Sequence, residues 1–208
     1  NWWKSVGHDD VRGSILSVLS ASGAFGERTS ELFTAILRSR DIPEQWRTVI
    51  LTILYKGKGV KQDPSNTRGI ALLSILAKAY EKILVDRIII FLEQNGQFDQ
   101  NTNGSRKGRS AVDNAMLVMM AAEAVILDGG RLLGAFLDER KCYPTAFRDG
   151  IMHALHQAGV IGDVWHAMDA MQEGLQCRVR VQQRLSENFE LLQGILEGAC
   201  SSPPKYSI

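Results

Sequence analysis

A group of basic side chains and one carboxylate behind an apolar run are the features of this chain best suited to chemistry. Arg106, Lys107 and Arg109 lie in one short loop, and such a group can contact the phosphates of a nucleic acid, although a solvated loop is the alternative. The apolar run Arg131–Leu137 is typical of a β-strand and would deliver Asp138 at its end. No phosphate-binding glycine loop, nucleophile elbow or His-Glu-x-x-His motif is present.

Cysteine and histidine, the residues most often used for disulfides and zinc, are few and poorly spaced. The cysteines Cys142, Cys177 and Cys200 include no Cys-x-x-Cys pair, which argues against a zinc site and a disulfide framework and favours free thiols in a reducing, intracellular compartment. His153 and His156 would share a helix face, but the four histidines form no metal-binding set.

The chain is nearly neutral as a whole but not along its length. Its 208 residues are 45% hydrophobic with a formal net charge of +1, and no apolar run reaches the roughly 18 residues that a membrane span needs. Residues 38–109 carry thirteen Lys and Arg against seven Asp and Glu, whereas residues 110–208 carry eight against twelve. The basic centre suits contact with RNA or DNA, and it equally suits solvated helix faces.

The elements expected to position these residues begin with helices and one buried strand. Helical periodicity covers Thr29–Arg38, and the β-branched run Thr48–Tyr55 indicates a buried strand. The next helix is expected over Leu72–Glu93, with Gly96 at the place of a C-cap. Ser110 and Asp113 then form a capping box at the start of a second long helix, which ends at Gly129.

The methionines of that second helix and the elements after it complete the expected architecture. Met116, Met119 and Met120 are expected to fill the core. Two shorter helices follow, and then two strands separated by a polar turn: Arg148–Gln157, Asp163–Glu173, Cys177–Gln182 and Asn188–Gln193. Long helices between separated strands predict an α+β fold that is helix-rich with a small mixed or antiparallel sheet.

Several stretches of the chain, in order, resemble the reverse transcriptase domain of non-LTR retrotransposons and of group II intron-type elements. The resemblance covers nearly the whole chain, and each stretch by itself is weak. It is carried by Pro43–Trp46 with Lys56–Lys58, Asp63–Ser74, Gly104–Asp113, Phe136–Tyr143 and Gln193–Gly198 with Pro203. The resemblance implies a reverse transcriptase-like fingers region and a partial palm, with residues 1–128 as fingers and 129–208 as palm, or both as one compact unit.

The resemblance also implies roles for individual residues. Asp138 matches the first metal-binding carboxylate of a polymerase, which acts with further carboxylates on two divalent cations; an exposed aspartate at a helix start is the alternative. Lys56 and Arg68 match positions that reach the incoming triphosphate. Tyr143 matches the aromatic residue that screens the 2′-OH of the nucleotide, with a buried core tyrosine as the alternative, and Glu197 falls in the nucleotide-binding motif.

Departures from the family pattern concentrate at these same positions. Gly69 stands where the family has a proline after the arginine, so the loop that presents Arg68 is expected to be looser. Pro144 replaces an aspartate, and Glu197 replaces a glutamine, so that a carboxylate would repel a triphosphate. The chain stops before an Ala-Asp-Asp-type motif, and Pro204 is expected to break the helix that precedes that motif in the family.

Together these observations predict a degenerate, truncated reverse transcriptase-like domain without polymerase activity, acting as a structural or interaction subunit of a larger assembly. Other protein subunits are the expected partners, with RNA or DNA bound through the basic region 38–109 as a further option. Two alternatives stay open: a fragment of an active RNA-directed DNA polymerase, and a non-catalytic module that binds RNA or DNA. No cofactor is expected for the chain as it stands, and Mg²⁺ is expected for an active polymerase, with Asp138 as its ligand.

Overall fold

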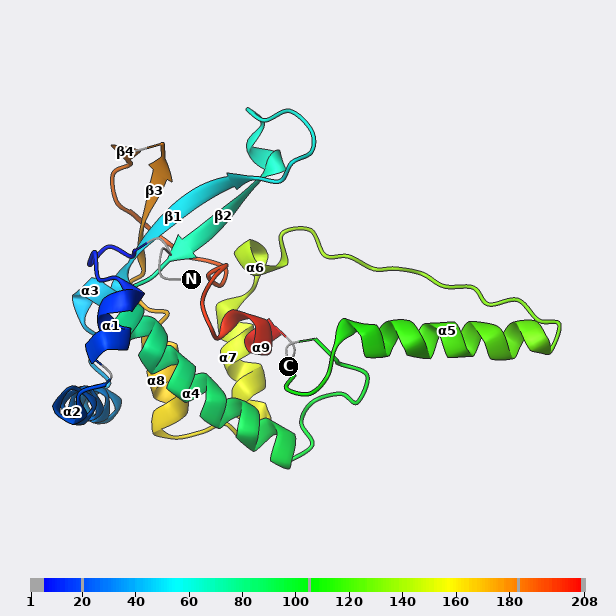
Figure 1. The fold of residues 1–208 in the computed structure, drawn as a ribbon, viewed down its shortest axis with the longest axis horizontal. Helices are drawn as coiled ribbons and strands as arrows, with labels where there is room; N and C mark the ends of the chain where they lie inside the picture. Colours follow the sequence, from blue (N-terminus) through cyan, green and yellow to red (C-terminus); the bar gives the residue numbers. More distant parts are fainter. Residues whose placement is uncertain (1–5, 20, 105, 183, 207–208) are drawn as a thin grey trace.

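A computed structural model describes residues 6–19, 21–104, 106–182 and 184–206 of the chain, so the outer ends of both expected domains lie outside the described residues. It shows the expected α+β fold, with many helices and a small mixed sheet (Figure 1). In chain order the elements are α1 (Gly13–Leu19), α2 (Gly23–Ser39), α3 (Glu44–Arg47), β1 (Thr48–Tyr55), the 3₁₀ turn η1 (Pro64–Asn66), β2 (Thr67–Leu72), α4 (Ile75–Gln94), α5 (Ala111–Leu127), α6 (Cys142–Thr145), α7 (Arg148–Gln157), α8 (Asp163–Ala170), β3 (Gln176–Val181), β4 (Arg184–Leu185), β5 (Phe189–Glu190) and α9 (Ser202–Tyr206).

The sheet joins segments that are far apart in the sequence. Its strands follow the order β2-β1-β3-β4, and β5 also pairs with β3. β1 runs antiparallel to β2 and parallel to β3, and Val49 of β1 lies beside Cys177 of β3 at the fully buried centre of the sheet. Burial decreases along β1, so its far end projects from the body and carries the chain into Lys56. The strand expected at Thr48–Tyr55 is confirmed, although only its first half is buried.

The helix expected from Leu72 begins later, because the residues before it form a strand. Thr67–Leu72 is β2, which pairs with β1 through registers such as Leu51 with Ala71. Ser74 then caps α4, its hydroxyl accepting a hydrogen bond from the Ala77 amide at 3.5 Å. Of the residues of β2, only Leu72 had been included in the helical pattern, since an apolar residue at the end of a strand fits either period.

Most of the core lies where helices α2, α3, α4, α7 and α8 meet. Trp46 and Tyr80 are buried in it, and their ring centroids lie 5.7 Å apart. Phe33 of α2 packs edge-on against Tyr80, with 5.3 Å between centroids. The helices expected over 29–38 and 148–157 are confirmed as α2 and α7, and both supply core residues, Ile36 and Leu155 among them.

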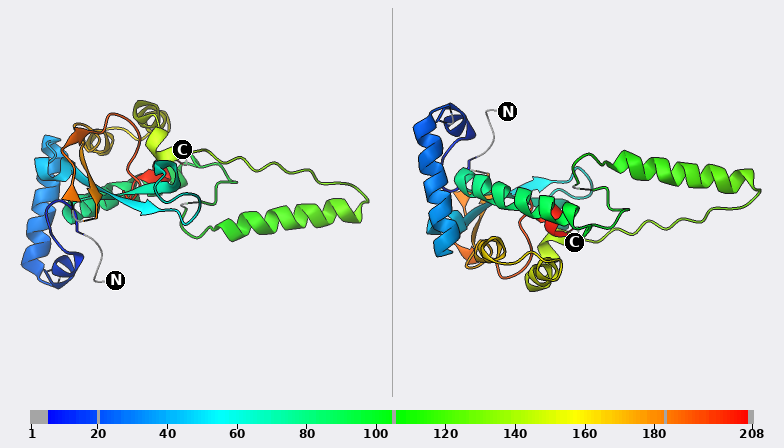
Figure 2. Two further views of the ribbon diagram at one scale, coloured as in Figure 1. Left: turned by 90° about the horizontal axis from the view of Figure 1, so that it is seen from above. Right: turned by 90° about the horizontal axis from the view of Figure 1, so that it is seen from below.

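Helix α5 has the expected start but the opposite environment from the one predicted for its methionines. The Asp113 carboxylate accepts a hydrogen bond from the Ser110 amide at 2.6 Å, which confirms the capping box. Yet no described residue of α5 is buried, and Met116, Met119 and Met120 are 56–64% exposed. Figures 1 and 2 show the reason: α5 projects from the body as an arm, beyond the reach of the core. The prediction that these methionines fill the core was therefore wrong.

The strand expected at Arg131–Leu137 is not formed in the described chain. These residues run back along the arm without regular structure, and Phe136 and Leu137 are 98% and 97% exposed. A β-strand needs a neighbouring strand to satisfy its backbone hydrogen bonds, and nothing in the described residues lies beside this segment to supply one.

The prolines near the end of the described chain begin a helix rather than break one. α9 spans Ser202–Tyr206 and contains Pro203 and Pro204 in its first turn, where the missing amide protons would have had no partner in any case. The expectation that Pro204 ends helical structure was therefore wrong. Among the described residues, no helix is both long enough and apolar enough to cross a bilayer.

Candidate functional site

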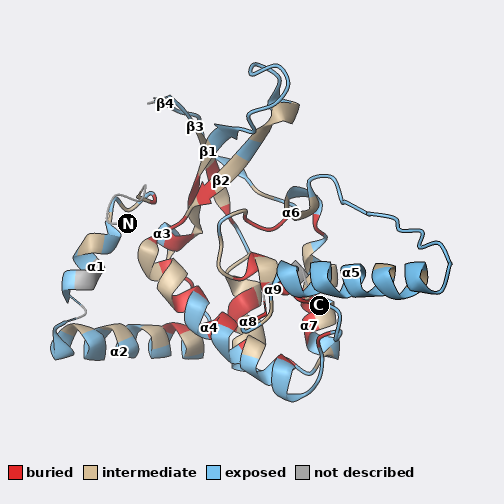
Figure 3. Ribbon diagram, turned by 45° about the vertical axis from the view of Figure 1, so that its right-hand side comes forward, coloured by how far each residue is buried: buried red, intermediate tan, exposed pale blue. Residues whose placement is uncertain are grey.

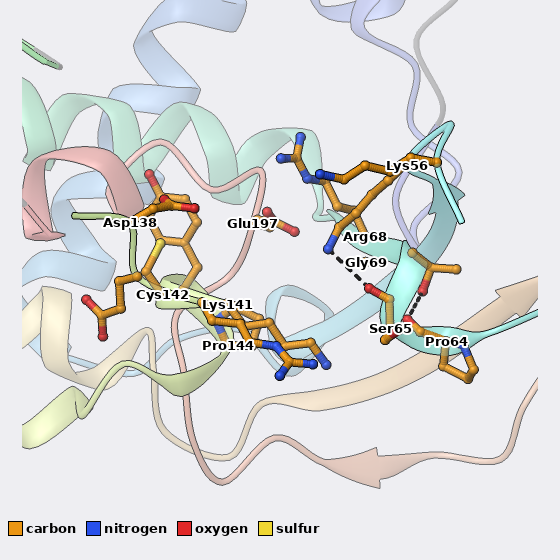
Figure 4. A pocket seen from close by; sticks show the side chains of 15 residues that line it. Lys56, Pro64, Ser65, Arg68, Gly69, Asp138, Lys141, Cys142, Pro144 and Glu197 are labelled. Carbon is orange, nitrogen blue, oxygen red and sulfur yellow. Dashed lines mark hydrogen bonds between the residues drawn. The ribbon is translucent and has the colours of Figure 1, made fainter. Parts of the chain in front are cut away.

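One cavity of about 830 Å³ brings together residues from segments far apart in the sequence (Figure 4). It lies between the projecting end of the β1–β2 pair and α6. Its lining includes five basic and three acidic side chains: Lys56, Lys58, Arg68, Arg140, Lys141, Asp138, Glu139 and Glu197. Lys56, Arg68, Asp138, Tyr143 and Glu197, all singled out from the sequence, thus line a single cavity.

The basic side of the cavity is built on paired strands. Arg68 lies in β2 opposite Leu54, and Gly69 lies opposite Ile53, so both are held by the ladder with β1. The looser loop expected from Gly69 is therefore not observed. Lys56 directly follows β1, and its ammonium group donates a hydrogen bond to the Ser65 carbonyl oxygen at 3.3 Å. Arg68 is thus presented by the sheet itself, and Lys56 by the turn that directly follows β1.

The turn between these strands is held by its own hydrogen bonds. The Asp63 carboxylate accepts from the Ser65 hydroxyl at 2.7 Å and from the Ser65 amide at 2.8 Å. These bonds favour the charged carboxylate, and they lower the pKa of Asp63 below its usual value. The Thr67 hydroxyl also donates to the Pro64 carbonyl oxygen at 2.7 Å. The loop beside Lys56 and Arg68 is consequently well defined.

The acidic side of the cavity is built on irregular backbone. Asp138 belongs to the exposed segment that precedes α6 and is not on a strand. Lys141 then has a positive φ of 56°, which turns the chain into α6. Tyr143, on α6, is half-buried, and burial is the main reason that its pKa is raised, with a smaller contribution from the neighbouring Cys142. In Figure 4, Asp138 and Arg68 lie on opposite sides of Glu197.

Two glycines fix the segment that carries Glu197. Gly194 has a φ of +81°, and a Cβ there would lie 2.4 Å from the Pro144 carbonyl oxygen. Gly198 has a φ of +114°, and a Cβ there would lie 2.9 Å from the Ala71 carbonyl oxygen. Both positions thus require glycine for conformation and for space. The segment 194–198 therefore packs closely against Pro144 of α6 at one end and against Ala71 of β2 at the other.

Backbone hydrogen bonds complete this attachment. The Ile195 amide donates to the Tyr143 carbonyl oxygen at 2.8 Å, and the Ala71 amide donates to the Glu197 carbonyl oxygen at 2.7 Å. Glu197 is therefore held between the basic and the acidic sides of the cavity. Its carboxylate adds negative charge where the neighbouring lysines and arginines would otherwise attract an anion.

Arg148, which was not among the residues singled out from the sequence, supports the same segment from behind. Its guanidinium donates to the carbonyl oxygens of Gly194 at 2.6 Å, Gln172 at 3.1 Å and Gln193 at 3.3 Å. Burial lowers its pKa. One signal was available in the sequence: an arginine in the first turn of a helix is disfavoured by the helix dipole, so its presence at the start of α7 needs another reason.

A second group anchors the far end of the segment; it contains Glu81, which belongs to the family-like stretch of the sequence but had been given no role there. Glu81 of α4 is buried and accepts hydrogen bonds from the Cys200 amide at 2.9 Å and from the Ser201 hydroxyl. Lys205 of α9 is also buried. Burial is the main reason that its pKa falls to about 8, and the nearby charge of Glu81 acts in the opposite direction. Glu81 thus holds the segment before α9 against α4.

The basic loop predicted to contact nucleic acid lies apart from this cavity, and two of its arginines bind their own chain. Arg106 pairs with Glu93 at 2.6 Å and lies over the Phe98 ring, with 5.1 Å from Cζ to the ring centroid. Arg109 donates to the Gln100 carbonyl oxygen at 2.6 Å. Lys107 is exposed.

The carboxylates of the cavity do not fit a two-metal centre. Asp138, Glu139 and Glu197 all line it, but within the described ranges no three Asp, Glu, His or Cys side chains come close enough together to hold a metal ion. Two divalent cations need several convergent carboxylates. The described residues thus supply one candidate ligand position, Asp138, without its partners.

Comparison with known proteins finds transposon proteins that are similar to this chain. No protein-family model matches it. It is 22% identical over 205 residues to a probable RNA-directed DNA polymerase from transposon X-element of Drosophila melanogaster, a match that covers 99% of this chain and 22% of that protein. The same figures hold for a probable RNA-directed DNA polymerase from transposon BS. A putative 115 kDa protein in the type-1 retrotransposable element R1DM is 29% identical over 136 residues, which are 65% of this chain and 13% of that protein.

The chain therefore spans about a fifth of the length of the first two relatives. The similarity to these two relatives extends over nearly all of this chain. It confirms the resemblance inferred from the motifs of the sequence. The chain is thus similar, over nearly its whole length, to part of two probable RNA-directed DNA polymerases of Drosophila melanogaster transposons, and this similarity supports a reverse transcriptase-like domain.

Proposed function

We propose that this domain binds the phosphates of a nucleotide in the cavity beside α6 but does not by itself add nucleotides to a primer. In this proposal residues 1–128 correspond to the fingers of a reverse transcriptase and residues 129–208 to part of its palm. The domain then serves a larger assembly as a structural and interaction subunit. The observation that carries the proposal is the convergence of five family-matched positions on one cavity that has no complete set of metal ligands among the described residues.

Phosphate binding is supported by the charge balance of the cavity. Five basic side chains line it against three acidic ones, and Arg68 is presented by a paired strand, with Lys56 directly after the neighbouring strand β1. An arginine held on a strand can donate two parallel hydrogen bonds to a phosphate. Glu197 weakens this attraction, so the affinity is expected to be modest, and removing its charge should strengthen binding.

The proposed absence of polymerase activity is supported by the position of Asp138 on the acidic side of the cavity. Asp138 lies on irregular, exposed backbone, whereas a catalytic metal ligand must be held within a fraction of an ångström. Among the described residues, Asp138 also lacks the convergent carboxylates that two cations require. The role as an interaction subunit is supported by the projecting arm, since α5 exposes apolar residues along its whole length.

Nucleotide binding is tested by titrating the protein with a fluorescent deoxynucleoside triphosphate. We expect Arg68→Ala to weaken binding about tenfold and Glu197→Gln to strengthen it several-fold. Arg28→Ala is the matched control, because Arg28 is exposed on α2, where it pairs with Glu31. Equal affinity for the wild type, Arg68→Ala and Glu197→Gln would contradict the proposed binding site.

The lack of catalysis is tested by primer extension with an RNA template, deoxynucleoside triphosphates and Mg²⁺ or Mn²⁺. We expect no incorporation by the wild-type chain. Incorporation that is abolished by Asp138→Asn would overturn this part of the proposal. It would favour the second candidate, a segment of an active RNA-directed DNA polymerase, which the names of the two full-coverage relatives make the main alternative.

A further inference from the structure

The outer edge of β2 forms part of the wall of the cavity beside α6. Within the described sheet β2 is the end strand, so one of its edges pairs with β1 and no described strand pairs with the other. Figure 3 shows burial decreasing along the β1–β2 pair towards its projecting end. Thr67, Arg68 and Gly69 line the cavity, and no residue of Thr48–Tyr55 does so. The cavity therefore borders the edge at which β2 presents the backbone groups that β1 does not use.

The pairing register decides which amides of β2 face this edge. In an antiparallel pair, successive residues direct their backbone groups alternately towards the partner strand and away from it. The Lys56 amide donates across the ladder to the Asn66 carbonyl oxygen at 2.9 Å, so Asn66 faces β1. The Ala71 amide donates in the other direction, to the Glu197 carbonyl oxygen. By this alternation the outward-facing residues of β2 are Thr67, Gly69 and Ala71.

Two of these three outward amides already have acceptors. The Thr67 amide donates to the Pro64 carbonyl oxygen at the end of η1, and the Ala71 amide donates to Glu197 at 2.7 Å. The Gly69 amide faces away from β1, and no other described residue accepts a hydrogen bond from it. Gly69 is half-buried, and backbone amides away from bulk water are nearly always hydrogen-bonded. The Gly69 amide is thus a donor that lacks an acceptor among the described residues, at the wall of the cavity.

An anion is the acceptor that the surroundings of this amide favour. Arg68 immediately precedes Gly69, and both line the cavity together with Lys56 (Figure 4). Phosphate oxygens accept hydrogen bonds from backbone amides and from guanidinium groups. A peptide strand fits less well, because strand addition uses the outward groups of alternate residues, and the outward amides on both sides of Gly69 are already bonded.

The side-chain position of Gly69 is not what the cavity uses. A Cβ at Gly69 would meet nothing within 4 Å, and its φ lies outside the left-handed region. Neither space nor conformation therefore requires glycine here, in contrast to Gly194 and Gly198. What residue 69 offers a ligand is its backbone, and the amide can be removed or kept by choosing the residue at this position.

We propose that the Gly69 amide is a phosphate-binding group of this cavity and donates a hydrogen bond to an oxygen of a nucleotide phosphate beside the Arg68 guanidinium. The inference rests on the nucleotide binding proposed above and deepens it, because it assigns recognition to the phosphate chain and not to the base or the sugar. The bound phosphate gives the Gly69 amide an acceptor, as the Thr67 and Ala71 amides already have. Inorganic triphosphate alone is then sufficient to engage it.

The first experiment titrates two variants of residue 69 with the fluorescent deoxynucleoside triphosphate. Gly69→Pro removes the amide proton, and proline is compatible with an edge strand where its nitrogen faces away from the ladder. Gly69→Ala keeps the amide proton and is the matched reference, because its Cβ meets nothing within 4 Å. We expect Gly69→Pro to bind about tenfold more weakly than Gly69→Ala.

The outcomes of this titration separate the two proposals. Equal affinities of Gly69→Pro and Gly69→Ala would overturn the role of the amide. If Arg68→Ala still weakens binding in that case, the proposed nucleotide site stands without it. A wild type that binds no triphosphate would overturn the proposed nucleotide binding and this inference together.

A second measurement on the wild-type chain does not depend on how the variants fold. Amide hydrogen exchange is followed by NMR with and without saturating inorganic triphosphate. We expect exchange of the Gly69 amide to slow several-fold when triphosphate is added, and the Thr67 and Ala71 amides, which are already bonded, to change much less. Unchanged exchange at Gly69 would contradict the proposal. So would a Gly69 amide that is already protected before triphosphate is added, because another group would then occupy it.

Discussion

The guanidinium group of Arg148, at the start of α7, donates a 2.6 Å hydrogen bond to the carbonyl oxygen of Gly194, more than forty residues later in the chain. Two further carbonyl oxygens, of Gln172 and Gln193, accept from the same group. One side chain thus holds the turn that leads to Glu197, while the Gly194 backbone packs against α6. The position of Glu197 in the cavity beside α6 depends on this contact.

Removing the guanidinium should loosen that turn. We expect Arg148→Met to lower the free energy of unfolding by about 2–3 kcal/mol, because half-buried carbonyl oxygens lose their donors. Urea denaturation measures this effect. Arg148→Lys should recover only part of it, since an ammonium group cannot reproduce the planar arrangement of donors. Arg28→Ala, at an exposed ion pair on α2, should change stability by less than about 0.5 kcal/mol.

The two glycines beside Glu197 should resist substitution for reasons of both space and conformation. Gly194→Ala and Gly198→Ala place a Cβ 2.4 Å and 2.9 Å from backbone carbonyl oxygens, at positive φ. We expect each to cost more than about 2 kcal/mol in thermal or urea unfolding. Gly23→Ala is the control, because a Cβ there meets nothing within 4 Å and Gly23 lies in α2. Unchanged stability of Gly198→Ala would contradict the close approach to Ala71.

Burial of Lys205 predicts a pH dependence of stability. Its pKa is lowered from 10.5 to about 8 in the folded chain, so the unfolded chain binds the proton more tightly. The destabilisation is complete below pH 8, and stability is regained as the pH rises towards 10.5. We expect the unfolding free energy of the wild type relative to Lys205→Met to rise by about 3 kcal/mol over this interval.

The pH dependence of the wild type must be compared with that of Lys205→Met, because the Cys177 thiol changes the unfolding free energy with pH in the opposite direction. Burial raises the pKa of Cys177 from 9.0 to about 11. The unfolded chain loses that proton first, so this residue contributes stability below pH 9 that is lost as the pH rises to 11. A wild-type curve that stays parallel to that of Lys205→Met would contradict the assignment to Lys205.

In the basic loop, Arg106 and Lys107 are expected to have different roles: Arg106 stabilises the fold, and Lys107 is free to contact a nucleic acid. Arg106→Ala should lower the melting temperature, because Glu93 and Phe98 lose their partner. Lys107→Ala should leave the melting temperature unchanged, since Lys107 is exposed. If the loop also contacts RNA, Lys107→Ala should reduce both the affinity for a primer–template duplex and its salt dependence. Filter binding at several salt concentrations measures this, and equal binding by both chains would exclude Lys107 as a contact.

The hydrophobic and charged patterns of the sequence were sufficient to predict much of the local structure. β1, α2, α7, the capping box of α5 and the α+β class follow from periodicity and cap residues, because these depend on neighbours only a few positions away. The family-matched motifs also named the residues that meet in one cavity. That group was predicted from the resemblance, since periodicity carries no information about which distant segments meet.

Tertiary structure alone decided what surrounds each segment. Thr67–Leu72 is a strand because β1 pairs with it, whereas Arg131–Leu137, which the sequence also predicted as a strand, is irregular because no strand among the described residues pairs with it. Met119 looks like a core residue in sequence, and it is exposed because α5 extends away from the body. Arg148 and Glu81 acquired their roles only from carbonyl and amide groups far away in the chain. Burial and hydrogen bonding between distant segments are properties of the packed chain, and no local pattern encodes them.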